Sequence, residues 1–223
     1  MDPGSARQRR LSGMTRGDEI AGNGCPPMRR CASVAGMTSF CLFTTAIGTC
    51  ALVWQSERIV AAQLPERDED TARRRLGRRF PDSIEADPPG FVRQAIEDVV
   101  ALLAGGQRDL SHLPIDLSAT PEFNRRVYAV ALAIPPGETL TYGEVAARIG
   151  EPGAARAVGV ALGQNPIPII VPCHRVLAAG GKTGGFSADG GVETKLKILT
   201  IEKARTSTEP SLFGDLPLQA KRR

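Results

Sequence analysis

A cysteine followed directly by a histidine, Cys173 and His174, is the pair of residues best suited to chemistry in this sequence. A thiol reacts as its thiolate, and an adjacent imidazole can accept the proton directly or through a water molecule. Neighbouring side chains on an extended strand point to opposite faces, so direct contact between the two requires a turn at Pro172. The pair therefore predicts either an activated nucleophile or a buried structural cysteine beside an unrelated histidine.

The segment that leads to this pair, residues 165–175, is stiff and apolar. Three prolines restrict its backbone, and Ile and Val residues lie between them. We therefore expect the segment to hold Cys173 and His174 at a fixed place in the fold.

A helix-turn-helix pattern precedes this segment. An amphipathic stripe that begins at Phe123 predicts a helix ended by the prolines at 135–136. Thr141, with Glu144 three residues later, predicts the capped start of a helix that reaches Ile149. The Gly- and Pro-rich residues 150–153 then predict a turn before another helix.

That last helix, residues 154–163, is built almost entirely of small side chains around one cation. Ala154, Ala155, Ala157 and Gly159 surround Arg156. A major-groove reader needs several long polar side chains, whereas a slim helix with one Arg suits the narrower minor groove of DNA. A tight helix–helix contact in the core is the alternative, and the pattern of this helix alone favours it.

The first half of the chain predicts a small unit of strands and helices. Residues 40–64 predict an antiparallel hairpin plus a third short strand, and helices are expected over residues 68–79 and 90–103. The whole chain is thus expected to be α+β, with a small N-terminal antiparallel sheet with helices and a mainly helical C-terminal domain. The expected parts are a disordered leader (1–37), an α+β domain (38–115), a linker (114–121), a helix-turn-helix domain (121–202) and a disordered tail (203–223).

Charge and cysteine usage exclude several classes of protein. The chain of 223 residues has a net charge of +4, but its two tails carry all of the excess, so any DNA binding must depend on a local patch. The five cysteines contain no CxxC pair, which argues against a disulfide framework or a zinc site and favours a cytosolic location. The uncharged residues 39–54 are too few to span a membrane.

The residues Pro172–Val176, together with the helix-turn-helix and Asn165, resemble the signature of the O6-alkylguanine-DNA alkyltransferases, also called methylated-DNA–protein-cysteine methyltransferases. The resemblance is dense over residues 123–202 and looser from residue 40 onward. It implies direct reversal of DNA damage, in which the alkyl group of O6-alkylguanine, and also that of O4-alkylthymine, passes irreversibly to a cysteine. It also implies a monomer that binds duplex DNA through the minor groove and needs no metal or cofactor.

The resemblance assigns a role to individual residues. Cys173 accepts the alkyl group, His174 backed by Glu202 takes the thiol proton, and Tyr142 donates a hydrogen bond to the purine. The DNA-binding residues would be Ala154, Ala155, Arg156, Ala157, Gly159 and Asn165, with Arg156 filling the gap left by the extruded base and Asn165 acting as a hinge. The base pocket would include Val176, Phe186 and Ser187.

Two positions depart from the family's usual pattern. Phe186 stands where many relatives have Tyr, which predicts a change in substrate preference, and the segment 187–192 is longer than in some relatives. A non-catalytic, alkyltransferase-like module that only binds damage is the alternative, although such modules lack the reactive cysteine that this chain has. A multiple-turnover cysteine hydrolase is a third possibility.

Three further predictions concern residues outside this site. Thr194, Lys195 and Lys197 are expected to form a polar, solvated helix face, and a position of Lys195 near a phosphate of bound DNA is the alternative. His112 is expected at the surface without a partner. Cys41 and Cys50 are expected to be thiols in the core of the hairpin.

Overall fold

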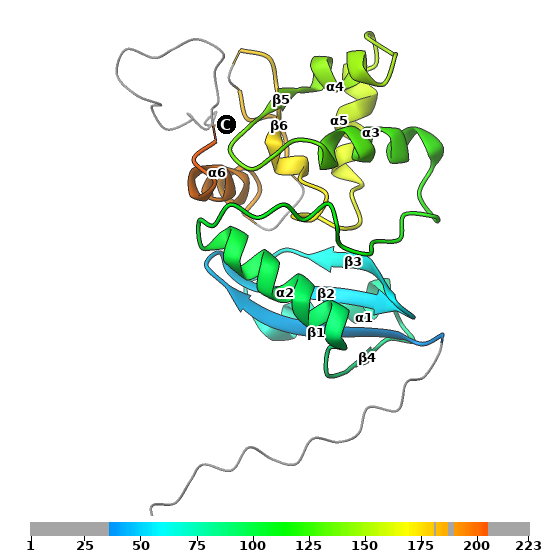
Figure 1. The fold of residues 1–223 in the computed structure, drawn as a ribbon. Coiled ribbons are helices and arrows are strands. Elements are labelled where there is room, and N and C mark those ends of the chain that lie inside the picture. The colour runs from blue at the N-terminus through cyan, green and yellow to red at the C-terminus, as the bar shows by residue number, and fades with distance from the viewer. Residues whose placement is uncertain (1–35, 181, 187–189, 205–223) are drawn as a thin grey trace, which may run out of the picture. The chain divides into compact units, whose positions relative to one another are not determined.

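The first part of the fold is a four-stranded sheet. The computed structural model describes residues 36–180, 182–186 and 190–204, and its sheet consists of β1 (Thr38–Thr45), β2 (Gly48–Gln55), β3 (Arg58–Gln63) and β4 (Ile84–Glu85). The strand order is β3-β2-β1-β4 (Figure 1). The antiparallel pairs β1–β2 and β2–β3 confirm the predicted hairpin and third strand. β4 was not predicted and pairs with β1 in parallel, so the sheet is mixed rather than antiparallel.

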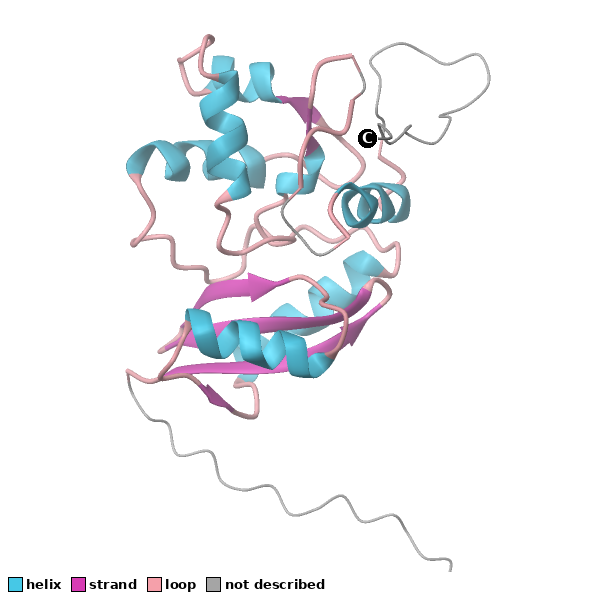
Figure 2. Cartoon of the chain, turned by 180° about the vertical axis from the view of Figure 1, so that it is seen from behind, coloured by secondary structure: helices cyan, strands magenta, loops and turns pink. Residues whose placement is uncertain are grey.

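Two helices cover the opposite faces of this sheet (Figures 1 and 2). They are α1 (Glu69–Arg79) and α2 (Gly90–Leu103), close to the predicted ranges. Asp68 caps α1, since its carboxylate accepts a hydrogen bond of 2.7 Å from the Thr71 amide. Leu76 of α1 packs with one set of alternating strand side chains, whereas α2 packs with the other set, which includes the buried Cys41 and Cys50.

Part of the predicted linker, residues 114–121, forms backbone hydrogen bonds with the edge strand β3 of the sheet. The Ile59 amide donates to the Pro114 carbonyl at 2.8 Å, and the Asp116 amide donates to the Ile59 carbonyl at 2.8 Å. One cluster of buried side chains continues from the α2 face of the sheet into the helices that follow. The division into domains at residues 38–115 and 121–202 therefore stays a prediction.

The second part of the fold is mainly helical. Its elements are α3 (Glu122–Leu132), β5 (Leu140–Thr141), α4 (Tyr142–Arg148), α5 (Ala155–Gly163), the 3-10 turn η1 (Cys173–Arg175), β6 (Val176–Leu177) and α6 (Val192–Ile201). The pair α4 and α5 is the predicted helix-turn-helix. Thr141 and Glu144 form the predicted cap, because each side chain accepts a hydrogen bond from the backbone amide of the other.

A short parallel pairing joins two distant segments of this part. Leu140 of β5 pairs with Val176 of β6 and Thr141 with Leu177, so Tyr142 and Ala178, which follow the two strands, lie at the same end of the pair. The pairing thereby joins the segment before α4 to the strand that follows η1. No helix within the described ranges is long and apolar enough to cross a membrane. The predicted leader (1–37) and tail (203–223) lie almost wholly outside the described residues.

Candidate active site

Cys173 lies at the start of a tight turn. The turn η1 follows Pro172 directly, as direct contact between thiol and imidazole was predicted to require. The Cys173 side chain is buried, with 7% of the residue exposed, and His174 is fully buried. The described side chains offer no hydrogen-bond partner to the His174 Nδ1 atom, so the turn does not join the two groups directly.

Asn165 fixes the stiff segment before this turn. Its Nδ2 group donates to the Val171 carbonyl at 2.8 Å, and its Oδ1 atom accepts from the Ile167 amide at 3.0 Å. One side chain thus bonds to two points of the loop between α5 and η1. This geometry agrees with the hinge position predicted for Asn165.

A buried ionic cluster lies behind His174. The Nε2 atom of His174 is 3.1 Å from a carboxylate oxygen of Glu202, which is 3% exposed. Arg175 donates to both oxygens of the same carboxylate, at 2.9 Å from Nε and 2.7 Å from Nη2, and to the Ile134 carbonyl at 2.6 Å. Sequence analysis predicted the contact between His174 and Glu202 but missed Arg175, which it considered only as part of the motif.

The protonation state of this cluster follows from burial and hydrogen bonding. Burial lowers the pKa of His174, although Glu202 opposes this, so the imidazole is neutral near pH 7. Burial acts to raise the pKa of Glu202, but hydrogen bonds from His174 and Arg175 outweigh it and lower the pKa to about 2. Glu202 is therefore ionised and accepts the Nε2 proton. This arrangement assigns the lone pair to Nδ1, the atom that can receive a proton.

The sulfur of Cys173 is a thiol at rest. Burial raises the pKa of Cys173, and the nearby Asn165 and Lys195 oppose this only in part. Burial therefore favours the neutral thiol over the thiolate before substrate binds. The thiolate must form as the proton leaves, and His174 is the buried base close to it in the sequence.

A glycine, Gly184, leaves space for the Tyr142 side chain beside it. A Cβ atom on Gly184 would stand 2.7 Å from the Tyr142 hydroxyl oxygen, and Gly184 has a φ of +70°, which glycine adopts without strain. Burial raises the pKa of Tyr142. The phenol is thus protonated and can donate a hydrogen bond. Gly184 was not among the residues predicted for the site.

Six predicted site residues line one cavity of about 540 Å³, here called the base cavity. They are Tyr142, Ala155, Arg156, Gly159, Cys173 and Phe186. Of these lining residues, Arg156 is exposed on α5, while Cys173 is buried. Its volume is within the range of small-molecule sites and is sufficient for a purine.

The remaining predicted site residues lie around this cavity. Ala157 is exposed on α5, and Ala154 is half-buried at its start. Val176 is fully buried, and its amide donates to the Cys173 carbonyl. Ser187 lies outside the described residues. Within the described ranges, no group of three or more His, Cys, Asp or Glu side chains could hold a metal ion.

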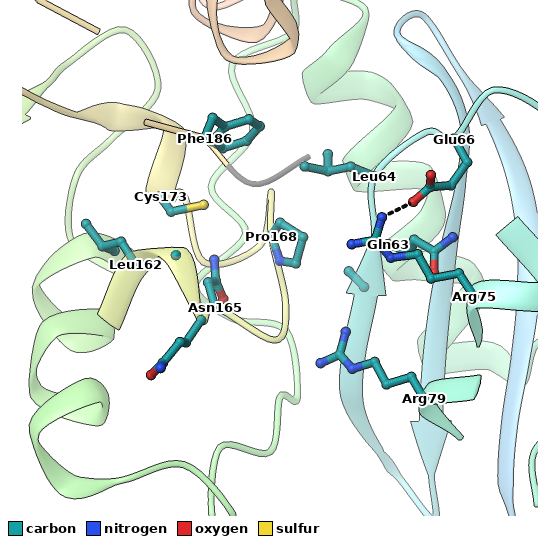
Figure 3. Close-up of a pocket in the computed structure, with 13 residues that line it drawn as sticks. Gln63, Leu64, Glu66, Arg75, Arg79, Leu162, Asn165, Pro168, Cys173 and Phe186 are labelled. Carbon is teal, nitrogen blue, oxygen red and sulfur yellow. Dashed lines mark hydrogen bonds and ion pairs between the residues drawn. The ribbon is translucent and has the colours of Figure 1, made fainter. Parts of the chain in front are cut away.

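A second cavity, of about 310 Å³, touches Cys173 from the side of the N-terminal sheet. It shares Cys173, Phe186, Leu162 and Gly163 with the base cavity. We call it the α1 cavity, because Arg75 and Arg79 of α1 form its far wall (Figure 3). Sequence analysis did not predict it, since nothing local in the sequence places α1 near Cys173.

The prediction for Lys195 is wrong. Lys195 is fully buried, its Nζ atom donates to the Val176 carbonyl at 2.6 Å, and it lies 5.9 Å from the centre of the Tyr142 ring. The spacing of Lys195 from the buried Ile198 and Leu199 on α6 contained the signal, because residues three and four apart share a helix face. His112 is exposed as predicted, but its Nε2 atom lies 3.4 Å from the Asp98 carboxylate and so has a partner.

We expect Lys195 to make folding stability depend on pH. Burial lowers its pKa from 10.5 to about 8, so the unfolded chain binds this proton more tightly than the folded protein. Stability should therefore rise as pH increases from about 8 to 10.5, by on the order of 3 kcal/mol from this group. Urea unfolding of wild type and Lys195→Met across this range should show the difference in unfolding free energy moving in favour of wild type.

Lys197→Met is the matched control, because Lys197 lies on the same helix and is exposed. Its difference from wild type should stay constant over the same pH range. If the difference in unfolding free energy between wild type and Lys195→Met were also constant over this range, the lowered pKa of a buried Lys195 would be contradicted.

Comparison with known proteins finds a family model and curated relatives that match part of this chain. Residues 122–204 match the family model of the DNA binding domain of 6-O-methylguanine DNA methyltransferase. The methylated-DNA–protein-cysteine methyltransferase of Mycobacterium tuberculosis (strain ATCC 25618 / H37Rv) is 46% identical over 125 residues, which cover 56% of this chain and 73% of that protein. These matches support the resemblance seen in the sequence.

Two crystal structures from Mycobacterium tuberculosis have a similar fold. The O6-methylguanine methyltransferase aligns with a TM-score of 0.61 and 36% identity, covering 79% of this chain and 99% of that chain. The structure of that organism's OGT in complex with DNA aligns with a TM-score of 0.60 and 36% identity, covering 74% and 92%. Both likenesses extend over the sheet as well as the helices.

Proposed function

This chain belongs to the family of methylated-DNA–protein-cysteine methyltransferases, which repair O6-methylguanine in DNA, and we propose that it moves the alkyl group irreversibly onto the sulfur of its own Cys173. The observation that carries this assignment is the buried Cys173 that lines the base cavity. His174 follows it in the same turn and has a lone-pair nitrogen and an ionised Glu202 behind it.

The proposed reaction is one in-line displacement. As the Cys173 proton passes to His174 Nδ1, directly or through water, the sulfur attacks the alkyl carbon, the S–C bond forms and the bond from carbon to O6 breaks. The electron pair of that bond leaves with guanine, where the Tyr142 hydroxyl can stabilise the developing charge by donating to the purine. The resulting thioether is not hydrolysed at a useful rate, so each molecule reacts once.

The base must leave the duplex before it can reach the buried sulfur. Extrusion of a nucleotide costs a few kcal/mol, and less for a poorly paired base, which gives a first level of selectivity. We propose that α5 enters the minor groove, because its exposed residues include the cation Arg156 beside Ala157 and Val160, none of which is a long polar reader of base edges except Arg156. The DNA complex of the similar OGT supports DNA as the partner.

We propose that the protein acts as a monomer in the cytosol, where the buried free thiols Cys41 and Cys50 stay reduced.

Mass spectrometry after incubation with a methylated duplex tests this function. We expect one equivalent of methyl, located on the peptide that contains Cys173, followed by no further reaction. Unmodified protein that still binds the duplex would favour a non-catalytic damage-binding module, and repeated turnover on an ester would favour a hydrolase. The same assay with O4-methylthymine tests the second substrate that we propose.

Loss of Arg156 should impair repair of duplex DNA more than reaction with a free base. We expect Arg156→Ala to slow transfer from duplex O6-methylguanine by about tenfold or more, because the gap in the stack is left unfilled and extrusion of the base costs a few kcal/mol. Transfer from free O6-benzylguanine should stay within about twofold of wild type, since no base is extruded.

Arg108→Ala serves as the control, because it removes the same charge from an exposed position in the loop after α2. Rates on both substrates should match those of wild type. Equal losses of Arg156→Ala on duplex and free base would show that Arg156 does not assist extrusion.

A further inference from the structure

We propose that the α1 cavity receives O6 substituents larger than methyl and favours those that end in a carboxylate. This inference rests on the proposed function and names a substrate class for it. The cavity lies between Cys173 and Phe186 on one side and Arg75 and Arg79 on the other (Figure 3).

The geometry of displacement requires space beside the sulfur. In an in-line reaction the sulfur and the leaving oxygen lie on opposite sides of the carbon, and the other groups on that carbon point sideways. In a methyl group these other groups are only hydrogen atoms, whereas a longer substituent needs space beside the reacting carbon for the rest of its chain. With guanine in the base cavity, the α1 cavity provides that room, because both cavities share Cys173 and Phe186.

The wall of the α1 cavity has the chemistry to bind an anion. Arg75 pairs with Glu66 at 2.5 Å, so these two charges largely cancel. Arg79 lies 5.1 Å from the centre of the Phe80 ring and has no carboxylate partner among the described residues. The three groups therefore leave one net positive charge on the wall.

Arg79 also differs from its neighbours on α1 in its environment. Arg79 is exposed as a residue, and the partial burial of its guanidinium, followed by the positive charge of Arg75, lowers its pKa. By contrast, Arg73 donates to both Glu85 and Glu69 on the outer surface and lines neither cavity. A carboxylate in the α1 cavity would supply the counter-charge that Arg79 lacks, through charge-assisted hydrogen bonds.

The arginines lie on the wall opposite the sulfur, so the substituent needs a flexible chain. A carboxymethyl group keeps its charge close to the reacting carbon, whereas a carboxypropyl group extends across the cavity. We therefore expect the longer acid to gain more from Arg79 than the shorter one.

The test measures rates of transfer from duplexes that carry O6-methyl-, O6-butyl-, O6-carboxymethyl- or O6-carboxypropylguanine. Wild type, Arg79→Gln, Arg79→Lys and Arg74→Gln are compared. Arg74 is the control, since it lies on the same helix, is exposed and does not line the cavity. Arg79→Gln should slow transfer of carboxypropyl by about tenfold to a hundredfold, the range for a lost hydrogen bond to a charged group. The methyl and butyl rates should not change, and Arg79→Lys should recover most of the loss.

The other outcomes separate the two proposals. If Arg79→Gln slowed transfer from all four duplexes equally, Arg79 would act in DNA binding or in stability, and the inference would be overturned. A carboxypropyl transfer rate that Arg79→Gln leaves unchanged would also overturn it. Failure of wild type to accept even methyl would overturn the proposed function itself, and this inference with it.

Discussion

Cys173→Ala is expected to transfer no alkyl group at all. The variant lacks the only acceptor that the proposed reaction uses, and loss of a catalytic nucleophile elsewhere costs about a millionfold in rate. The base cavity keeps its other lining residues, so binding of a damaged duplex should remain within about threefold of wild type, since phosphate contacts supply most of the affinity. Transfer of radiolabelled methyl and a DNA-binding titration measure the two quantities.

Cys50→Ala provides the matched control. Cys50 is also a buried free thiol, and burial raises its pKa to about 11, but it lies in β2, away from both cavities. This variant should still accept one equivalent of methyl. Radiolabelled methyl on the Cys173→Ala protein would contradict the assignment of Cys173 as the acceptor. Absence of the label from the Cys50→Ala protein would contradict it as well.

Glu202→Gln is expected to destabilise the protein strongly as well as slow the reaction. The substitution leaves the Arg175 cation buried without its counter-ion, which costs about 3–5 kcal/mol for pairs of this kind. It also removes the charge that stabilises a protonated His174, so transfer should slow by about a hundredfold, within the range for general-base catalysis. Urea unfolding and single-turnover kinetics at low temperature measure the two effects separately.

The stability effect of Glu202 should disappear in acid. The pKa of Glu202 is lowered from 4.5 to about 2, so its contribution is complete above about pH 4.5 and is lost as pH falls towards 2. The difference between wild type and Glu202→Gln should therefore shrink by on the order of 3 kcal/mol over that range.

Glu193→Gln is the control for this experiment, because Glu193 is exposed on α6, the helix that Glu202 follows directly. It should change neither stability nor rate appreciably. A Glu202→Gln protein with wild-type stability near neutral pH would show that the carboxylate does not compensate Arg175.

Elements with local signals were predicted well. The cap formed by Thr141 and Glu144, the hairpin of β1 and β2 and the ends of α1 and α2 all depend on residues a few positions apart. Turn geometry, capping hydrogen bonds and hydrophobic periodicity act over such distances, so they can be recognised in one sequence. The contact of His174 with Glu202 was anticipated only through the family resemblance.

Elements that depend on distant pairing were missed. The parallel strand β4 has two residues and no periodic pattern, and the pairing of β5 with β6 joins residues 36 positions apart. Lys195 was expected in solvent because charged residues are seldom buried, yet the Val176 carbonyl accepts its hydrogen bond inside the fold.

The sequence by itself determined the local elements and the adjacent thiol and imidazole that the turn at Pro172 carries. Only the tertiary structure decided that Arg175 joins Glu202 behind His174, that Lys195 is buried beside Tyr142, and that Arg75 and Arg79 of α1 face Cys173 across a cavity. The physical reason is that burial and charge pairing depend on which distant segments pack together, whereas helices, caps and turns depend on neighbours along the chain.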